Sequence, residues 1–217
     1  MVSGMNARIV TLCSLLALAA ACDNDPTKGK AQATVSEPAA APQAAPAATT
    51  NSTTYPFSQD GSKVEFVGAK VTRKHDGKVK TFNGTIKLVD NDPTKSSVQA
   101  ELDLASIETD DEKLTKHLLS ADFFDVPNHP KAKFESTSIK AGGEGGASHT
   151  VSGNLTLRGT TKQISFPARI KHSEGSVQVE AEFGINRKDF NIVYPGMAND
   201  LIKDEVLIRL KLDAKRG

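Results

Sequence analysis

The stretch TFNGTIKL, residues 81–88, alternates polar and apolar side chains along its length. Successive side chains of a β-strand point to opposite faces, so a period of two places Phe82, Ile86 and Leu88 on one face. Asn83 and Lys87 fall on the other face. One apolar and one polar face predict a half-buried strand of an antiparallel sheet.

The same alternation recurs on both sides of this stretch. Further strands are expected over residues 63–67, 98–104, 131–140, 151–157, 162–171, 177–183 and 206–212. Turn signals separate them at Asp76-Gly77, Asn91-Asp92-Pro93, Gly142–Gly146, Arg158-Gly159 and Glu174-Gly175. The chain is therefore predicted to be all-β, with about eight strands.

Eight strands with one apolar face each could form a sandwich or a closed barrel, and closure would remove the exposed edges. An eight-stranded barrel is wide enough either to be filled by side chains or to hold one small ligand. Periodicity leaves both alternatives open.

One helix is expected to interrupt the strands. Thr109-x-x-Glu112 fits a capping box, which predicts a helix start at this point. The apolar stripe of this helix would consist of Leu114, Leu118 and Ala121. We expect the helix to end near Ser120, before Pro127.

The N-terminus is typical of an exported protein. Arg8 precedes the apolar run IVTLCSLLALAAA, residues 9–21, which predicts a signal peptide over residues 1–21. Ala19-Ala20-Ala21-Cys22 resembles a bacterial lipobox, so we expect cleavage before Cys22 and acylation of that residue, including a palmitate-type chain. The alternative is an ordinary cleavage site beside a chance cysteine. Cys13 would leave with the signal peptide, and no intramolecular disulfide would remain.

Residues 22–54 are predicted to comprise the lipidated cysteine and a disordered tether rich in Ala and Pro, because large apolar side chains are nearly absent. Residues 55–217 are predicted to form one β-barrel domain. The expected location is the cell envelope of a bacterium of Gram-negative type, with a membrane-anchored chain that faces the periplasm.

Charge excludes one class of partner. The chain has 27 basic and 26 acidic residues, and Arg8 is the only charge in the signal sequence, so the processed chain is neutral. Without basic runs and interleaved aromatic residues, nucleic-acid binding is not expected. A homodimer stays open as an alternative to a monomer.

The segment LLSADFFDVPNHP, residues 118–130, carries the strongest candidates for chemistry. Asp122 and Asp125, together with His117 and His129, could form a metal or acid/base site. The alternative is that Asp122, Asp125 and His129 stabilise a turn while Leu118, Phe123 and Phe124 face an apolar interior. His75, His149 and His172 are expected to be solvated in turns. No catalytic motif of recognised spacing occurs, so no enzyme activity and no metal are expected.

Several blocks resemble the YceI-like family, the polyisoprenoid-binding group of exported bacterial proteins. The blocks are Ser106–Asp110, Lys116–Val126, Pro130–Thr137, Asn154–Lys162, Ile185–Phe190 and Asp204–Val206. The resemblance covers residues 55–213. Directly after Asp189-Phe190, Asn191 stands where the family usually has glycine.

The resemblance implies a lipocalin-like, eight-stranded antiparallel barrel with one α-helix inserted after the third strand. It also implies non-catalytic binding of an isoprenoid or other amphiphilic lipid in the lumen, for transport, storage or sequestration, with no cofactor. A polyisoprenoid or isoprenoid quinone is the expected bound molecule. The expected lipid-binding residues are Phe66, Phe82, Ile107, Leu118, Phe123, Phe124, Phe134, Phe183 and Phe190. The alternative is a filled barrel with a structural or stress-related role in the envelope.

Overall fold

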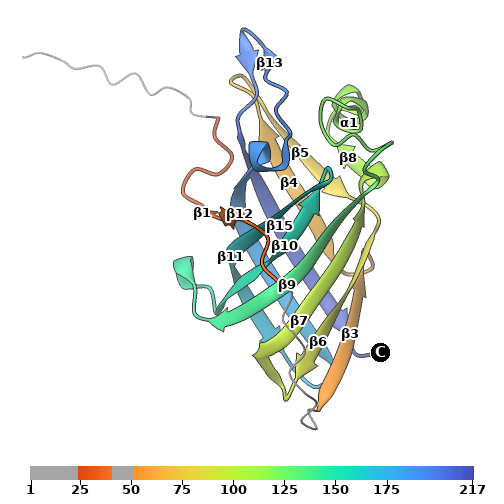
Figure 1. Ribbon diagram of the computed structural model, residues 1–217, viewed down its shortest axis with the longest axis vertical. Coiled ribbons are helices and arrows are strands. Elements are labelled where there is room, and N and C mark those ends of the chain that lie inside the picture. The colour runs from red at the N-terminus through yellow and green to blue at the C-terminus, as the bar shows by residue number, and fades with distance from the viewer. Residues whose placement is uncertain (1–23, 41–50) are drawn as a thin grey trace, which may run out of the picture.

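The fold is a curled sheet of mostly antiparallel strands with one short helix (Figure 1). The computed structural model describes residues 24–40 and 51–217, so the predicted signal peptide and Cys22 lie outside the described residues. The longer strands are β3 (Ser52–Ser58), β4 (Lys63–Ala69), β5 (Lys74–Val79), β6 (Phe82–Val89), β7 (Asp92–Asp103), β9 (Lys131–Ala141), β10 (His149–Leu157), β11 (Thr160–His172), β12 (Ser176–Asn186) and β15 (Glu205–Lys215). The shorter ones are β1 (Ala31–Gln32), β2 (Thr34–Ser36), β8 (Ile107–Thr109), β13 (Gly196–Met197) and β14 (Asp200–Leu201).

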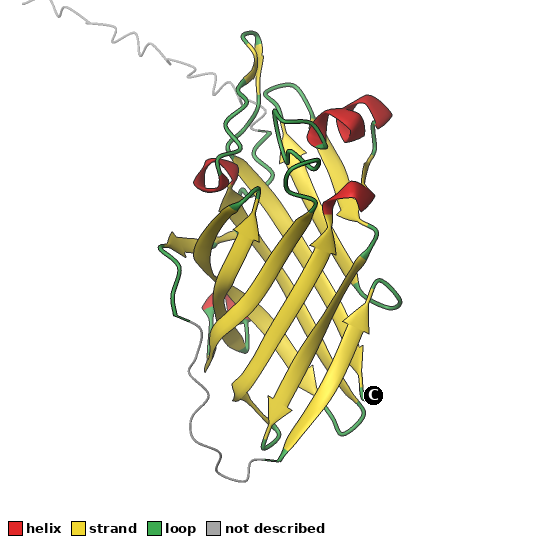
Figure 2. Cartoon of the chain, turned by 45° about the vertical axis from the view of Figure 1, so that its right-hand side comes forward, coloured by secondary structure: helices red, strands yellow, loops and turns green. Residues whose placement is uncertain are grey.

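The main sheet curls around an interior. Its order is β3-β6-β7-β9-β10-β11-β12-β15-β4-β5-β8, and β1 and β2 join it at β12 and β11. β3 and β4 follow one another in the chain, but β3 pairs with β6 while β4 pairs with β15. β3 also lies beside β15, so the sheet curls back toward its own beginning (Figure 2).

The all-β prediction with one helix is confirmed, whereas the count of eight is not. The eight expected strands are present as β4, β6, β7, β9, β10, β11, β12 and β15. Within the described residues the curled sheet has 13 strands, and β13 and β14 form a separate hairpin. In the order of the eight expected strands, the helix follows the third, β7, with the short strand β8 between them.

The predicted turn at Asp76-Gly77 is wrong, because both residues lie within β5. Gly77 pairs with Phe66 of β4, and a Cβ on Gly77 would lie 2.2 Å from Cζ of the Phe66 ring. Because Gly77 has no side chain, the Phe66 ring of the neighbouring strand can pack directly over its backbone. His75 lies on the same strand with only 9% of its surface exposed, so the expectation of a solvated turn histidine is also wrong there.

The helix α1 (Glu112–Leu118) begins at a different cap from the one expected. The Asp111 carboxylate accepts hydrogen bonds from the backbone N–H groups of Lys113 and Leu114, at 2.8 and 3.1 Å. An aspartate is a strong N-cap, and its charge suits the positive end of the helix. The Thr109 hydroxyl instead donates to the Asp111 carbonyl, 2.7 Å away. Ala121 is exposed beyond the helix end, so the expected stripe is wrong at that position.

Residues 24–40, hereafter the strap, lie alongside β11 and β12 and add the short strands β1 and β2 to the sheet. β11 and β12 pair with each other over Arg169–His172 and Val177–Glu180. Outside this region the two strands pair with the strap instead. Gln163–Ser165 of β11 pair with β2, and Phe183 and Gly184 of β12 pair in parallel with β1. The strap therefore satisfies backbone groups on both strands, while Ala33 and Val35 pack against the main core cluster.

The prediction of a disordered tether over residues 22–54 is therefore wrong for residues 24–40 and for the start of β3. Composition alone favoured disorder because the strap has few large apolar side chains. Its order comes mainly from backbone hydrogen bonds, which composition does not reveal. Residues 41–50 lie outside the described residues.

The interior is filled at one end and hollow at the other. The mouth end carries α1, the β13–β14 hairpin and the β4–β5 turn, and the far end carries turns 90–91 and 173–175 (Figure 1). Toward the far end the core contains Tyr55, Leu88, Ile139, Val177 and Ala214, which are all buried and do not line the apolar cavity described below. Close packing of these side chains keeps that cavity nearer the mouth.

Candidate functional site: an apolar cavity inside the curled sheet

The candidate site is a cavity of about 310 Å³ inside the curled sheet. Ligand pockets typically measure roughly 300–1,000 Å³, so this space lies at the small end of that range. Its wall is apolar or glycine except at Glu65, Lys70, His75, Arg187 and Lys203. Such a wall offers hydrocarbon contacts and almost no hydrogen bonds to an occupant.

All nine residues that were expected to bind lipid lie on this wall. They are Phe66, Phe82, Ile107, Leu118, Phe123, Phe124, Phe134, Phe183 and Phe190. Strand residues contribute from several sides, while Leu118 and the Phe123-Phe124 pair contribute from the helix and the loop that follows it. The structure thus brings these side chains to one space; a role in lipid binding remains a proposal.

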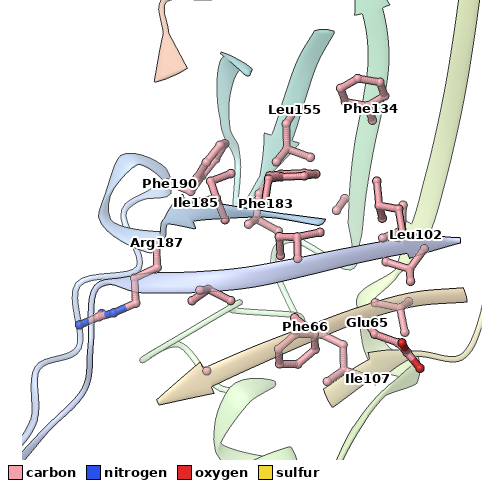
Figure 3. A pocket seen from close by; sticks show the side chains of 18 of the residues that line it. Glu65, Phe66, Leu102, Ile107, Phe134, Leu155, Phe183, Ile185, Arg187 and Phe190 are labelled. Carbon is pink, nitrogen blue, oxygen red and sulfur yellow. The ribbon is translucent and has the colours of Figure 1, made fainter. Parts of the chain in front are cut away.

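Aromatic rings form a continuous part of the wall. The Phe166 and Phe183 rings stack with their centroids 4.2 Å apart, and Phe134 lies 5.9 Å from Phe166. Figure 3 shows Phe134, Leu155 and Phe183 around the same space. The Phe134 ring lies over Gly153, where a Cβ would come within 2.4 Å of its Cζ atom. Glycine on β10 thus lets the ring lie flat against the sheet.

Other wall residues were not singled out from the sequence. Three of them lie on the inward face of a strand whose side chains alternate between two faces: Leu102 on β7, Leu155 on β10 and Ile185 on β12. Strand periodicity could therefore have identified them. Ile192 and Ile202 lie in irregular segments near the mouth, where no periodic signal exists. Sequence reasoning favoured aromatic residues and therefore overlooked the aliphatic part of the wall.

The segment after the helix packs over the mouth end of the cavity. The Phe124 N–H donates to the Leu118 carbonyl at 3.0 Å, and Asp125 adopts a positive φ of 50°. This tight turn directs buried Phe123 inward. The Phe123 ring contacts His117 at 4.9 Å and Tyr194 at 5.4 Å between centroids. Phe123 thus belongs to both the cavity wall and an aromatic cluster at the mouth.

The acids and histidines of this segment form local pairs. His117 Nε2 lies 2.8 Å from the Asp122 carboxylate, and the Asn128 amide donates to the Asp125 carboxylate at 3.0 Å. His129 Nε2 is 4.0 Å from Asp125. In the part of the chain that the structure describes, no three His, Cys, Asp or Glu side chains are grouped to hold a metal ion. The alternative of a turn held by polar side chains therefore fits the geometry.

Arg187 is a buried charge that ties the mouth-end loops together. Its guanidinium donates to the carbonyls of Ile192 and Lys203 at 2.6 and 3.1 Å, and to the Asp204 carboxylate at 3.0 Å. Burial lowers the pKa of Arg187 from its ordinary value, and Asp204 opposes that shift. In Figure 3 the guanidinium points away from the labelled apolar side chains, so Arg187 contributes its carbon stem to the wall.

The backbone at Asn191 explains a departure from the family pattern. Asn191 ends the short 3₁₀ turn η3 (Arg187–Phe190) in the left-handed conformation, with φ 59° and ψ 22°. Glycine adopts this conformation freely, and asparagine tolerates it better than most residues. The Asn191 side chain also donates to the Thr160 hydroxyl at 2.8 Å.

His75, Lys70 and Arg187, three of the polar residues of the cavity wall, have hydrogen-bond or ion-pair partners. His75 Nδ1 lies 2.8 Å from Asp110, and Lys70 pairs with Asp200 at 2.8 Å. Among the described residues no buried side-chain nitrogen or oxygen lacks a hydrogen-bond partner. A buried polar group without a partner is costly, so it would have indicated a ligand headgroup inside the cavity. The arrangement instead suits a hydrocarbon chain.

Among the residues that the structure describes, no helix combines the length and apolar character needed to span a bilayer.

Comparisons with known proteins agree with this architecture. The model of the YceI-like domain family matches residues 55–214. A protein of Serratia proteamaculans named UPF0312 protein is 40% identical over 94 residues, which cover 43% of this chain and 47% of that one. Protein YceI of Salmonella arizonae is 34% identical over 122 residues, covering 54% and 62%. The matched stretch thus spans about half to two thirds of these relatives.

Solved structures show the same fold. The crystal structure of Burkholderia cenocepacia BcnA is 25% identical, with a TM-score of 0.63, covering 73% of this chain and 99% of that one. A polyisoprenoid binding domain from Saccharophagus degradans, implicated in plant cell wall breakdown, is 15% identical with a TM-score of 0.60. It covers 77% of this chain and 100% of the other. At that identity the likeness concerns the fold.

Proposed function

Because the chain belongs to the YceI-like domain family, we propose that its cavity binds the hydrocarbon part of an amphiphilic lipid, of the isoprenoid class, without catalysis. The observation that carries the proposal is the apolar cavity of about 310 Å³, together with the finding that no buried side-chain nitrogen or oxygen among the described residues lacks a hydrogen-bond partner. The solved polyisoprenoid binding domain of the same fold supports the choice of lipid class.

The headgroup of this lipid would remain at the mouth. Near the mouth the wall includes partly exposed Lys70, Phe124 and Ile202, whereas buried side chains fill the far end. A polar headgroup keeps its hydration if it stays at the mouth, which avoids the free-energy cost of burying it unpaired. An isoprenoid alcohol or quinone with its tail inward meets this condition.

We further propose that the chain is a lipoprotein of the bacterial cell envelope, anchored through acylated Cys22 and facing the periplasm. The signal-like N-terminus and the lipobox-like Ala19–Cys22 support this part of the proposal. Several acyl chains hold a protein at a membrane far more firmly than one chain does. The function would be the carriage, storage or sequestration of lipid beside a bilayer.

The alternative of a filled structural barrel finds less support. A filled interior would leave no continuous space, yet the wall extends from Lys70 at the mouth to Leu212 on β15. The filled far end accounts for only part of the interior.

Mass spectrometry of lipids that co-purify with the full chain in a mild detergent tests the binding proposal. We expect an isoprenoid lipid in near-stoichiometric amount. The variant Ile185→Trp should lose it, because the indole fills the cavity from β12. The matched control is Gln178→Trp, an exposed position on the same strand, which should retain the lipid. Equal lipid content in both variants would contradict binding in the cavity.

A further inference from the structure

The exposed large apolar side chains gather at the mouth end. Among the described residues they are Val71, Val193, Met197 and Leu201, each exposed by 49–68%. We call these four residues the apolar tip. The far-end turns, in contrast, contain Asp90-Asn91 and Ser173-Glu174-Gly175. Because the exposed apolar side chains are confined to one end of the sheet, they indicate an interaction surface there.

Val71, Met197 and Leu201 of the apolar tip belong to one connected substructure. The Val71 N–H donates to the Leu201 carbonyl at 3.1 Å, which joins the β4–β5 turn to the β13–β14 hairpin. Lys70 adds an ion pair to Asp200 at 2.8 Å, and an isolated bridge links Lys70 to Ile202. Figure 1 shows the hairpin projecting beyond the ends of β4 and β5.

The tip adjoins the cavity. Lys70 and Ile202, which precede Val71 and follow Leu201 in the chain, both line the cavity wall. A surface in contact with the tip would therefore also lie beside the mouth. A hydrocarbon tail could then pass between that surface and the cavity with little exposure to water, which lowers the free-energy cost of transfer.

The start of the strap is attached to the same tip. The Asn24 side-chain amide donates to the Val71 carbonyl at 2.8 Å, and the Lys74 ammonium donates to the Asp25 carbonyl at 3.2 Å. Two peptide units separate Cys22 from Asn24 in the sequence and can span at most about 7 Å. An acyl anchor on Cys22 would consequently enter the bilayer next to the apolar tip.

We propose that the apolar tip is a membrane-docking surface, whose four side chains enter the interfacial region of a lipid bilayer and hold the cavity mouth against it. The proposal rests on the lipid-binding, lipid-anchored function proposed above and adds the orientation of the barrel. Apolar side chains that enter the boundary between headgroups and acyl chains add to the hold of an anchor. The partner is the bilayer itself.

The test uses the acylated full chain, reconstituted into vesicles of phosphatidylethanolamine and phosphatidylglycerol that contain brominated acyl chains. No cysteine occurs after Cys22, and acylation blocks the Cys22 thiol, so one introduced cysteine gives one labelling site. An environment-sensitive fluorophore is attached at Met197→Cys or, as the matched far-end control, at Ser173→Cys. We expect strong quenching by brominated lipid at position 197 and none at position 173.

A second variant tests whether the side chains cause the docking. In the Met197→Cys background, Val71→Asp with Leu201→Asp should reduce quenching to the far-end level while the chain stays anchored. The control adds the same charge through Ser173→Asp and Gln178→Asp, and should leave quenching unchanged. Without acylation, the Cys22→Ser chain should bind such vesicles at least about tenfold more weakly after the tip changes.

Equal quenching at positions 197 and 173, or quenching that persists in the tip variant, would overturn the proposal. A tip-dependent dimer in light scattering, without quenching, would assign the tip to a second copy of the chain and likewise overturn it. Lipid mass spectrometry of the same preparations reports on the cavity independently. Docking without cavity lipid would refute the binding function alone, and cavity lipid without docking would refute the orientation alone.

Discussion

Arg187 shows how a single side chain can hold the mouth end together. Its guanidinium satisfies carbonyls from two separate loops and one carboxylate, although only 5% of the side chain is exposed. We expect Arg187→Met to lower the free energy of unfolding by about 2–3 kcal/mol, since buried acceptors lose a charged donor. Urea unfolding followed by circular dichroism measures this change.

The neighbouring Lys188 supplies the control for this prediction. Its ammonium pairs with the same Asp204 carboxylate at 2.7 Å, but 50% of the Lys188 side chain is exposed. Exposed ion pairs contribute about 0–1 kcal/mol, so Lys188→Met should change stability by less than about 1 kcal/mol. Equal effects of the two substitutions would show that burial of Arg187 contributes little.

Glu205 should make stability depend on pH. Burial raises the pKa of Glu205, and the hydrogen bond from the Asn186 amide opposes that shift only in part. Between the ordinary and the raised pKa, the folded chain holds a proton that the unfolded chain has released. Stability from this group therefore falls as pH rises through that window, and the charged carboxylate is unfavourable at neutral pH.

We consequently expect Glu205→Gln to raise the unfolding midpoint at neutral pH and to flatten the pH profile just above the ordinary pKa of a glutamate. Denaturant unfolding of both chains at several pH values measures the difference. A parallel offset at every pH would argue for a packing effect in place of a titration.

At the scale of the elements, the strap is the part that sequence patterns missed. Val35 packs against the main core cluster and pairs with Ile164, whereas Thr34 beside it is exposed. We expect Val35→Asp to lower stability by about 1–2 kcal/mol, because a charge replaces a partly buried apolar side chain. Hydrogen exchange of the Gln163–Ser165 amides should also accelerate.

Thr34→Asp places the same charge one position away, on the exposed face of β2. This variant should keep both stability and exchange close to those of the unchanged chain. If both substitutions accelerated exchange equally, the strap would be held by backbone hydrogen bonds alone.

Most of the longer strands were accessible to prediction, but β3, β5 and the short strands were not. β6, β12 and β15 alternate regularly, so their buried faces could be derived from period two. β5 contains Lys74, Asp76 and Lys78 on one face and only His75, Gly77 and Val79 on the other. A face composed of a histidine, a glycine and one valine gives no apolar signal, even though all three are buried in the fold.

At the scale of the whole molecule, the hollow half of the interior should make stability depend on lipid. A ligand that binds only the folded state adds stability by mass action, about 2.7 kcal/mol at a hundredfold excess over its Kd. We expect an isoprenoid alcohol such as farnesol to raise the melting temperature of delipidated chain in a concentration-dependent way. The Ile185→Trp variant should show little of this increase.

Farnesol at equal concentration should leave the Gln178→Trp chain as responsive as the unchanged one. An equal rise in the melting temperature of the Ile185→Trp variant would mean that farnesol acts on the protein surface. The comparison separates occupation of the cavity from a general effect of the amphiphile.

The sequence by itself determined the all-β class, most of the long strands, the family and many of the apolar side chains that reach the interior. Periodicity and motif spacing are local properties, and they directly specify which side chains face inward. The tertiary structure alone decided that the far end is filled, that the mouth end is hollow and that the strap lies against β11 and β12. Packing volume and long-range backbone pairing depend on residues far apart in the chain, so no local pattern contains them.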